Sequence, residues 1–375
     1  MKLRYKLAFA TLAGLVLVLA ALALLLSHNG ACGPAPALSA DAGPMQAMMS
    51  RCYGSPDVLK LEAVAKPAPG PDEVLVKIRA AGVNPLDWHY MRGAPYVMRF
   101  SSGLGVPADP RMGVDFAGTV ETVGANVSRF KPGDEVFGGG SGAFADYLVI
   151  GEDRALAKKP GNISFAQAAA VPIAGITALQ ALRDKGQLQS GQAVLINGAS
   201  GGVGTFAVQI AKAMGARVTA VCSTRNIELV RSLGADEVID YTRDDYTQSG
   251  NKYDLIIDNV GNHSLLANRE VLQPGGRLIL VGGPAGNWLG PLLGPISAVL
   301  LSPFVGEEFI TLMARLRPAD LTALAELMQS GKVTPVIDRH YPLREVPEAI
   351  RYSEQGRARG KIVIDLGQAR AGQVE

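Results

Sequence analysis

Asn197-Gly198-Ala199-Ser200-Gly201-Gly202-Val203-Gly204 is the stretch of this 375-residue chain that decides its fold. It follows a short apolar run (193–197) typical of a buried strand, and it opens a segment (203–214) with helical periodicity. Read as Ala199-x-Gly201-x-x-Gly204, it supplies small residues for a tight turn and lets the backbone approach a pyrophosphate. The amides at the start of the helix would face the phosphates. We therefore predict a dinucleotide-binding loop here.

The sequence after this loop continues to alternate strands with helices. It predicts a strand (217–221), a helix (227–233) and two later strands (255–258 and 277–281). Such alternation indicates βαβ units and a parallel sheet. We assign residues 171–317 to this doubly wound α/β domain.

The segment 45–170 has a different pattern, with short runs of alternating polarity separated by Gly, Pro and Asp. It predicts a β-rich domain with strands that include 74–78, 116–123, 135–137 and 144–149. Beyond residue 317, the pattern predicts helices at 318–328 and 346–352 and a last strand at 361–366.

The N-terminal segment differs from both domains. Basic residues at positions 2, 4 and 6 precede an uncharged run (7–27) that is long enough, as a helix, to cross the ~30 Å hydrocarbon core of a bilayer. The hydrophobic part of a cleaved signal peptide is usually shorter. We predict an uncleaved signal anchor, a transmembrane helix over 1–27, followed by a linker over 28–44. A cleaved signal peptide and a buried core helix are the alternatives.

Composition argues against several classes of protein. The chain has 36 Lys and Arg against 34 Asp and Glu, whereas a nucleic-acid-binding protein would carry a basic face. Its 3 cysteines (Cys32, Cys52 and Cys222) indicate neither a disulfide framework nor a CxxC zinc site. Its 4 histidines argue against a multi-His metal site.

The end of the second predicted strand decides which dinucleotide is expected. A protein selective for NAD carries an acid there, which binds the ribose 2′-hydroxyl. This chain instead continues into Cys222-Ser223-Thr224-Arg225-Asn226. Ser223 and Thr224 can donate hydrogen bonds to a 2′-phosphate, and Arg225 can pair with it. The sequence therefore favours NADPH; the alternative is that Arg225 is an ordinary solvated loop residue.

Together these features resemble the medium-chain dehydrogenase/reductase superfamily, in particular its zinc-free quinone oxidoreductase-like branch related to zeta-crystallin. The resemblance covers about residues 45–366, and its motifs lie at 81–87, 113–118, 171–178, 198–204, 258–261 and 360–363. It implies a GroES-like β-barrel catalytic domain over 45–170, completed by 318–367. A Rossmann domain over 171–317 would lie between these parts, with the active site in the cleft.

The resemblance also indicates chemistry without a metal. Zinc-dependent relatives place a Cys ligand where this chain has Asn84, and a Gly-His-Glu where it has Gly113-Val114-Asp115. They also contain a four-Cys lobe, whereas no Cys lies between Cys52 and Cys222 here. Tetrahedral zinc needs three or four N or S ligands. We therefore expect a zinc-free site.

The resemblance further implies roles for single residues, beyond the glycine-rich loop itself. Asn84 would lie near the nicotinamide and the substrate carbonyl, and Tyr241 near the 2′-phosphate. The cofactor site would also include Thr177, Asn259 and Lys361. Two positions depart from the family pattern. Many members have Lys where this chain has Asn226, so Arg225 would have to compensate, and many have a substrate-side Tyr where it has His89 followed by Tyr90.

The predicted reaction is hydride transfer from NADPH to a quinone or to the β-carbon of an α,β-unsaturated carbonyl compound. Asn84 would donate to the developing oxyanion, unless it only forms the turn before Pro85. His89 or Tyr90 would supply a proton, unless His89 is a half-buried structural histidine. An enoyl or alkenal reductase and a non-catalytic NADPH-binding module are the alternative functions.

One further segment, 278–306, contains no charged residue. Residues 287–306 within it are interpreted either as a dimer seam or core element, or as an apolar lid or membrane-docking surface for a lipophilic substrate. We expect a homodimer attached to the membrane by its N-terminal helix. The distribution of positive charge places the body outside the cytoplasm, whereas the cofactor favours the cytoplasmic side, so the orientation stays open.

Overall fold

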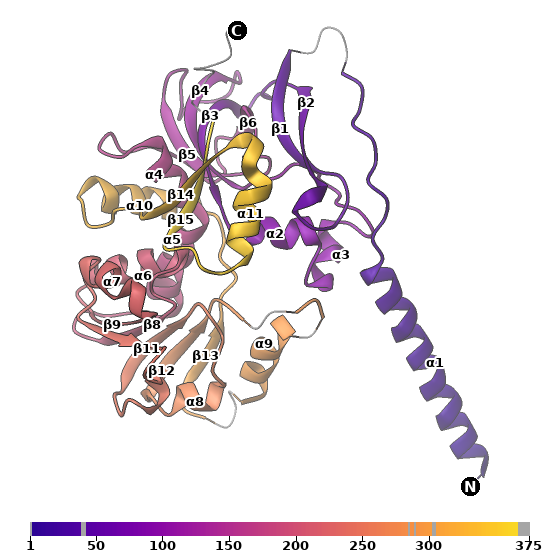
Figure 1. The fold of residues 1–375 in the computed structure, drawn as a ribbon, viewed down its shortest axis with the longest axis vertical. Helices are drawn as coiled ribbons and strands as arrows, with labels where there is room; N and C mark the ends of the chain where they lie inside the picture. Colours follow the sequence, from indigo (N-terminus) through magenta and orange to yellow (C-terminus); the bar gives the residue numbers. More distant parts are fainter. Residues whose placement is uncertain (1, 39–42, 284–285, 289, 302–304, 367–375) are drawn as a thin grey trace.

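The computed structural model describes residues 2–38, 43–283, 286–288, 290–301 and 305–366. Figure 1 shows a body of two lobes, each built around a sheet, and a long helix, α1 (Lys2–Ser27), that projects away from the body. The α/β fold class predicted from the sequence is confirmed for the body.

The lower lobe in Figure 1 contains a six-stranded parallel sheet in the order β10-β9-β8-β11-β12-β13. Its strands are β8 (Ala193–Asn197), β9 (Arg217–Cys222), β10 (Glu237–Asp240), β11 (Tyr253–Asp258), β12 (Leu272–Leu280) and β13 (Glu308–Thr311). Its helices are α5 (Pro172–Leu179), α6 (Gly202–Ala213), α7 (Ile227–Ser232), α8 (Leu265–Arg269) and α9 (Gly290–Leu301). The strand order changes direction between β8 and β11, and this point is where Rossmann folds bind their ligands.

The apolar run before the glycine-rich loop forms the centre of this sheet. Val194, Leu195 and Ile196 of β8 are fully buried. A strand covered by helices on both faces needs apolar side chains at successive positions, so it shows no alternation with polar residues. This is why the short run 193–197 could be predicted with its correct bounds.

The upper lobe contains a seven-stranded sheet in the order β14-β15-β3-β4-β5-β7, with β6 paired to β3. Its strands are β3 (Glu73–Val83), β4 (Asp115–Val123), β5 (Glu135–Gly139), β6 (Tyr147–Gly151), β7 (Leu156–Lys158), β14 (Ile337–Pro342) and β15 (Lys361–Asp365). Its helices are α2 (Pro85–Arg92), α3 (Arg99–Ser102), α4 (Phe165–Ala169), α10 (Pro318–Gln329) and α11 (Val346–Glu354), and β1 (Pro44–Ser50) pairs with β2 (Leu59–Ala65).

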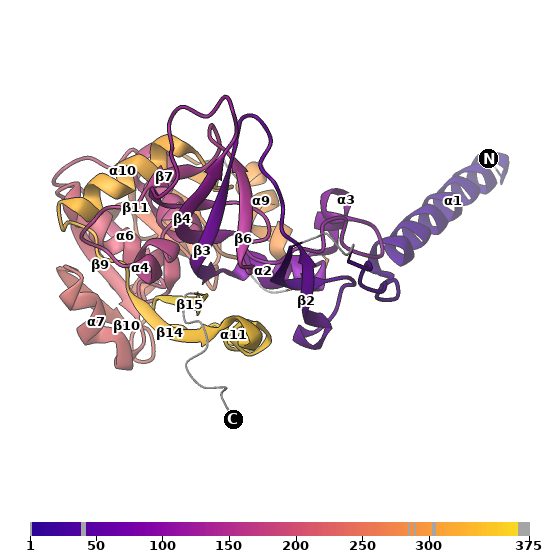
Figure 2. The same cartoon turned by 90° about the horizontal axis from the view of Figure 1, so that it is seen from above.

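The C-terminal part of the chain returns to this lobe. Strand β15 pairs antiparallel with β3, so that Ile362 lies opposite Val83. Seen from above, β14, β15 and α11 lie beside the strands of the N-terminal half (Figure 2). The strand predicted at 144–149 starts later, as β6, because Phe144 bonds to Met112 and Ala145 bridges to Ala47.

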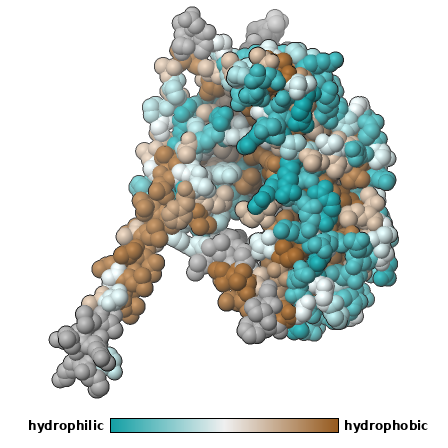
Figure 3. All heavy atoms as spheres, turned by 180° about the vertical axis from the view of Figure 1, so that it is seen from behind, coloured by the Kyte–Doolittle hydropathy of each residue, from teal (hydrophilic) through white to brown (hydrophobic). Residues whose placement is uncertain are grey.

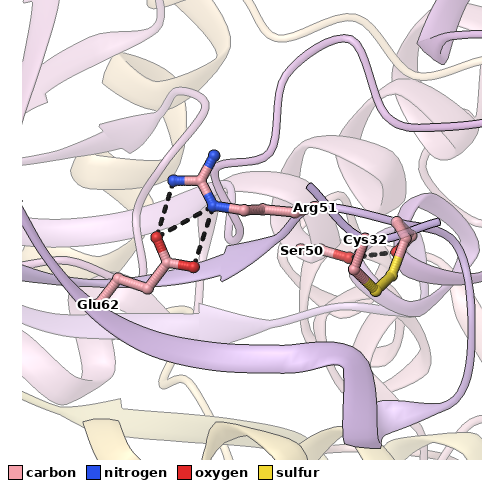
Figure 4. The surroundings of a disulfide bond; sticks show 5 residues. Cys32, Ser50, Arg51 and Glu62 are labelled. Carbon is pink, nitrogen blue, oxygen red and sulfur yellow. Dashed lines mark hydrogen bonds and ion pairs between the residues drawn. A yellow bond between two sulfur atoms is a disulfide. The ribbon is translucent and has the colours of Figure 1, made fainter. Parts of the chain in front are cut away.

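A disulfide ties the segment after α1 to the body. Cys32 and Cys52 are bonded, with their Cα atoms 4.6 Å apart. Figure 4 shows the bond beside Ser50, whose hydroxyl donates to the Cys52 carbonyl, and near the ion pair of Arg51 with Glu62. The cysteine count indicates no disulfide framework, and this bond corrects that expectation, because spacing along the chain does not reveal which thiols meet. Cys222 is free and buried.

Helix α1 carries the predicted membrane segment. Its part Phe9–Ser27 has the length and composition of a membrane span, and only 6% of that window is buried against the body. A signal sequence, the alternative considered above, satisfies the same criterion.

A substitution in the glycine-rich loop tests how closely α6 packs on β8. A Cβ atom at Gly204 would lie 2.2 Å from the Gly198 carbonyl oxygen. We expect Gly204→Ala to lower the free energy of unfolding by about 1–3 kcal/mol in urea denaturation, because the helix must shift. Gly161→Ala is the matched control, since its Cβ meets nothing within 4 Å. Equal effects of the two substitutions would contradict the packing described.

Candidate active site

The glycine-rich loop connects the C-terminal end of β8 to the N-terminus of α6. Gly198 has a φ of 75°, a backbone conformation that residues other than glycine rarely adopt. Ala199 is buried, and its N–H donates to the carbonyl of Val221 on β9. The first amides of a helix have no acceptor inside the helix, so this turn presents donors suited to a phosphate.

A cavity of about 340 Å³ lies beyond the C-terminal ends of the neighbouring strands. It is lined by residues at or just after the ends of β8, β9, β10 and β11: Asn197, Val221, Tyr241, Thr242, Arg243, Asp244, Asp245, Tyr246, Asn262 and His263. This is the position at which Rossmann folds hold the nucleotide.

Buried polar atoms near this cavity and loop have no partner within the described part of the chain. They are the Oδ1 atoms of Asn226 and Asn259 and the Oδ2 atom of Asp258. Asn259 donates through Nδ2 to the Asn197 carbonyl at 2.8 Å, which holds its side chain at the end of β8. Buried polar groups normally have partners, so these acceptors fit a ligand with hydroxyl or amide donors, as a nicotinamide dinucleotide has.

The end of β9 carries the residues predicted for the 2′-phosphate, and the structure adds an acid beside them. Asp240 ends β10 opposite Cys222, and its Oδ2 accepts a hydrogen bond from Thr224 Oγ1 at 2.5 Å. The hydrogen bond from Thr224 lowers the pKa of Asp240. Thr224 is therefore partly engaged by a contact that could not be predicted from the sequence, because Asp240 belongs to the next strand.

Arg225 lies beside two further arginines from the C-terminal part of the chain. Its Nη2 donates to the Arg357 carbonyl at 2.8 Å, and Arg359 Nη2 donates to the Arg225 carbonyl at 3.4 Å. Tyr241, also predicted here, is 60% exposed after β10. The guanidinium groups of Arg225 and Arg359 therefore lie close to the end of β9, and Asp240 lies at the end of the neighbouring strand β10.

Asn226 is a residue whose role sequence reasoning missed. Its Nδ2 donates to Ser200 Oγ at 2.9 Å and to Ser223 Oγ at 3.2 Å. It therefore ties the glycine-rich loop to the end of β9. The departure from the family's Lys at this position was the available signal.

A second group of polar residues gathers where three neighbouring strands of the upper lobe end or begin. Asn84 follows the end of β3, Asp115 begins β4, and Lys361 begins β15. They meet because Gly82 pairs with Asp115 and Val83 pairs with Ile362 in the sheet. We call Asn84, Asp115 and Lys361 the buried cluster.

The three side chains of the buried cluster are almost inaccessible to solvent. Lys361 Nζ lies 2.5 Å from Asn84 Oδ1 and 3.3 Å from Asp115 Oδ2. Lys361 is 3% exposed, Asn84 2% and Asp115 0%. An ion pair removed from water in this way is retained only when its remaining polar atoms are also bonded. Asp115 meets this condition through its Oδ1, which accepts from the Ile173 N–H at 3.0 Å.

The buried cluster lies against the glycine-rich loop. A Cβ atom at Gly202 would be 3.3 Å from Lys361 Cδ, so the lysine side chain packs on the loop backbone. Ile173 is at the start of α5, and Thr177 on the same helix donates to the Ile173 carbonyl at 2.7 Å. Lys361 therefore joins the predicted nucleotide loop to the predicted substrate residue, Asn84.

Asp87 adds a second buried carboxyl group beside the cluster. Its Oδ2 accepts from the Asn84 N–H at 2.7 Å, as part of the capping box that starts α2. Burial raises the pKa of Asp87 to about 7, and the Asp115 charge adds to this effect, whereas the Asn84 N–H and Lys361 oppose it. Burial also raises the pKa of Asp115, against the attraction of Lys361.

His89 and Tyr90 lie on α2 but are not part of the buried cluster. His89 Nδ1 lies 2.7 Å from the Ala94 carbonyl, and burial lowers the pKa of the imidazole. Tyr90 is exposed. Among the described residues, no hydrogen bond joins either side chain to Asn84, Asp115 or Lys361. The bond from Nδ1 to the Ala94 carbonyl agrees with the alternative that His89 is a half-buried structural histidine, and it leaves Nε2 available for another contact.

The described residues contain no group of three His, Cys, Asp or Glu side chains that could hold a metal ion. Beside Asn84 and Asp115, the two residues at the positions where zinc-dependent relatives would have ligands, the positively charged group is the Lys361 ammonium.

The raised pKa of Asp87 predicts a pH dependence of stability. In the unfolded chain this carboxyl group ionises near pH 3.8, and in the folded chain near pH 7. The folded state therefore loses stability relative to the unfolded state as the pH rises from about 4 to about 7, by up to ~4 kcal/mol. Asp87→Asn keeps an acceptor for Asn84 and removes the titration. We expect the unfolding free energy of this variant to exceed that of the wild type at pH 8 and to converge with it near pH 4; parallel curves would contradict the assignment.

Comparisons with known proteins agree with this architecture. Two family models match the chain, the alcohol dehydrogenase GroES-like domain over residues 70–161 and the zinc-binding dehydrogenase over residues 233–364. A chloroplast envelope quinone oxidoreductase homolog of Arabidopsis thaliana is 35% identical over 339 residues, which cover 86% of this chain and 98% of that protein. A 2-methylene-furan-3-one reductase of Solanum lycopersicum is 36% identical over 336 residues, covering 85% and 79%.

A solved structure extends the similarity to three dimensions. The quinone oxidoreductase from Coxiella burnetii superposes with a TM-score of 0.75 and 29% identity, covering 86% of this chain and 99% of that one. The coverage, the identity and the two-domain fold lead to one conclusion. The chain belongs to the medium-chain dehydrogenase/reductase superfamily of oxidoreductases, among relatives of the quinone oxidoreductase type.

Proposed function

We propose that the protein is a zinc-independent, NADPH-dependent reductase that transfers hydride to a quinone or to the β-carbon of an α,β-unsaturated carbonyl compound. The observation that carries this proposal is the buried cluster, in which an ammonium group paired with Asp115 contacts Asn84 and packs on the glycine-rich loop. The names of the two relatives above, a quinone oxidoreductase homolog and a reductase of a methylene-furanone, support these acceptor classes.

The bound cofactor would supply the hydride. The chain's own contribution is to stabilise the negative charge that develops on the acceptor oxygen. Asn84 Oδ1 is occupied by Lys361, so Nδ2 is the donor atom of this side chain; its contact with the Gly82 carbonyl is long, at 3.4 Å, and it also interacts with the Asp115 carboxylate. The Lys361 ammonium donates to Asn84 Oδ1 and so polarises the amide, which makes Nδ2 a stronger donor, while Asp115 balances the charge of the lysine.

The proton that completes the reduction has two candidate donors on α2. His89 donates its Nδ1–H to the Ala94 carbonyl, so Nε2 of the neutral ring is an acceptor and supplies a proton only from the imidazolium form, which burial disfavours. Tyr90 can present its exposed hydroxyl. Either group would act directly or through a water molecule. Asp87 serves α2 as a capping residue and has a carboxyl group that can hold a proton near neutral pH.

The proposed preference for NADPH is supported by the guanidinium group of Arg225 and by that of Arg359, which donates to the Arg225 carbonyl. Asp240 works against it, because a carboxylate close to a 2′-phosphate repels it. The hydroxyl contact of Thr224 disperses part of that charge. We therefore propose a preference for NADPH over NADH that depends on the arginines.

The location of the enzyme is proposed from α1 and from the disulfide. We infer a membrane-anchored protein, and the name of the Arabidopsis relative places that protein at an envelope membrane. The Cys32–Cys52 bond is typical of an oxidising compartment. The positive charges before the span also favour a body outside the cytoplasm, because they keep the N-terminus inside. The demand for NADPH favours the cytoplasmic side.

An acceptor panel separates the candidate functions. Oxidation of NADPH is followed by the loss of absorbance of the reduced nicotinamide, in parallel assays with quinones, enones and alkenals as acceptors. Turnover of quinones supports the first acceptor class, and turnover limited to enones or alkenals supports an enoyl or alkenal reductase. Cofactor binding without oxidation by any acceptor would leave the non-catalytic binding module.

Asn84→Ala tests the oxyanion assignment. We expect kcat for the best acceptor to fall on the order of 100-fold, with little change in the KM for NADPH, because the lost contact forms in the transition state. Asn126→Ala is the control, since Asn126 is bonded to Asp72 in an exposed loop. Undiminished turnover in the Asn84 variant would exclude Asn84 as the donor.

Arg225→Glu tests the phosphate contact. We expect KM for NADPH to rise roughly 10- to 100-fold while KM for NADH stays near its wild-type value, because a charge-assisted contact is replaced by repulsion. Arg344→Glu reverses another exposed charge and should change neither constant. An equal rise of KM for NADPH and KM for NADH in the Arg225 variant would show that Arg225 does not contact the 2′-phosphate.

A further inference from the structure

We propose that the surface around Tyr96 and the outer face of α9 form one bilayer-contacting surface, held against the membrane because Arg99 caps the end of α1. The surface consists of Val97, Phe100, Leu104, Val106, Trp288, Leu293, Ile296, Val299 and Leu300, and we call it the apolar surface. Its occupant is a lipid bilayer. The proposal is independent of the acceptor and the cofactor, and it rests on α1 lying in the membrane.

Helix α1 is the reason to expect a bilayer at all. Its 26 residues would extend roughly 39 Å at a rise of 1.5 Å per residue, and they contain no acidic side chain. Leu15, Leu17 and Leu24 are among its many exposed apolar side chains. An apolar helix that the body does not cover requires either lipid or another protein around it.

Arg99 fixes the C-terminal end of α1 to the body. It is 1% exposed, although it carries a charge. Its guanidinium group donates to the carbonyls of Leu26 (2.7 Å) and His28 (2.9 Å) and to Asn29 Oδ1 (2.8 Å). The last carbonyls of a helix lack partners within it and carry partial negative charge, so a buried cation is well placed here.

The body side of this contact is equally defined. Arg99 also donates to the Gly93 carbonyl at 2.7 Å, and its guanidinium carbon lies 4.4 Å and 4.6 Å from the ring centres of Tyr53 and Tyr96. Gly30 donates to the Gly105 carbonyl at 2.8 Å, and the Cys32–Cys52 disulfide follows. The connection between α1 and the body is therefore a docked contact and not a free linker.

The residues next to Arg99 point apolar side chains outward. Phe100, Leu104 and Val106 are exposed, as is Val97 in the short helix η2 (Tyr96–Met98), and Phe100 is 62% exposed. Because Arg99 holds the end of the membrane segment, residues adjacent to it must lie where that segment leaves the bilayer. Exposed aromatic and aliphatic side chains at this depth match the interfacial region of a membrane.

The same loop contacts the segment that leads into α9. Tyr96 N–H donates to the Asn287 carbonyl at 2.7 Å, and the Tyr96 ring packs edge-on against Trp288, with ring centres 4.7 Å apart. The contact joins the upper lobe to the lower lobe and aligns the two parts of the apolar surface. Leu289 and residues 302–304 of the segment predicted from the sequence lie outside the described residues.

Helix α9 extends the apolar surface onto the lower lobe. Leu293, Ile296, Val299 and Leu300 are exposed, with Val299 at 74%, and the helix contains no charged residue. Figure 3 shows apolar atoms of the lower lobe and of α1 at the same end of the molecule, whereas much of the remaining body in this view is hydrophilic. A bilayer that surrounds α1 therefore lies on the side that α9 faces, which is why we assign the surface to lipid and not to a second copy of the chain.

Fluorescence quenching tests the proposal on the full-length protein. Trp88→Phe leaves Trp288 as the single tryptophan, since the chain has 2. This protein is reconstituted into phosphatidylcholine vesicles with or without bromine on the acyl chains close to the headgroup. We expect brominated lipid to remove most of the Trp288 emission. Unchanged emission would overturn the proposal.

Three further substitutions locate the effect. Val299→Asp with Leu300→Asp should restore most of the emission, whereas Leu61→Asp, an exposed apolar position on β2, should not. Arg99→Gln should also restore emission while α1 keeps the protein in the vesicles; if this variant does not fold, the α9 pair still decides. Equal behaviour of the α9 pair and Leu61→Asp would contradict lipid contact. Absence of quenching in the single-tryptophan protein, together with cross-linking between two copies through α9, would also contradict it and would assign the surface to a second copy of the chain.

Discussion

The contact of Lys361 with Asn84, Asp115 and the backbone of Gly202 is the constraint on which the site depends. A lysine ammonium at 3% exposure is tolerated only with bonded acceptors, and removing one partner of such a pair typically costs about 3–5 kcal/mol. The first residue of β15 therefore couples the return of the chain to the upper lobe with the position of the nucleotide loop in the lower lobe.

In the proposed function, the same arrangement would polarise an acceptor without a metal ligand set. In the position where zinc-dependent relatives carry ligands, this chain has an amide, a carboxylate and, from a distant part of the sequence, an ammonium. The ammonium and Asp115 nearly neutralise each other, so the Asn84 amide is oriented without leaving a net charge on the cluster. The proposed preference for NADPH would depend on a different part of the molecule, on the balance between Arg225 and Asp240 near the ends of β9 and β10.

Much of the fold could be predicted from the sequence because its signals are local. The bounds of β8 follow from an uninterrupted apolar run, and the loop from Gly198 to Gly204 follows from small residues that only such a turn requires. The candidate site is harder, because it depends on which strands become neighbours. The contact of Lys361 with Asn84, the approach of Asp240 to Thr224 and the pairing of Cys32 with Cys52 join residues that no periodicity connects. Arg99 belongs to the same class, since its role appears only when α1 is seen against the loop that follows α2.

The most direct measurement of the central claim is turnover by protein whose metal content is known. The full-length protein is treated with a chelator, its zinc content is measured by elemental analysis, and oxidation of NADPH by the preferred quinone or enone is followed before and after zinc is added back. The account predicts the same rate at less than stoichiometric zinc as in the untreated protein, with no gain on addition. Loss of turnover with the metal and recovery with zinc would contradict it.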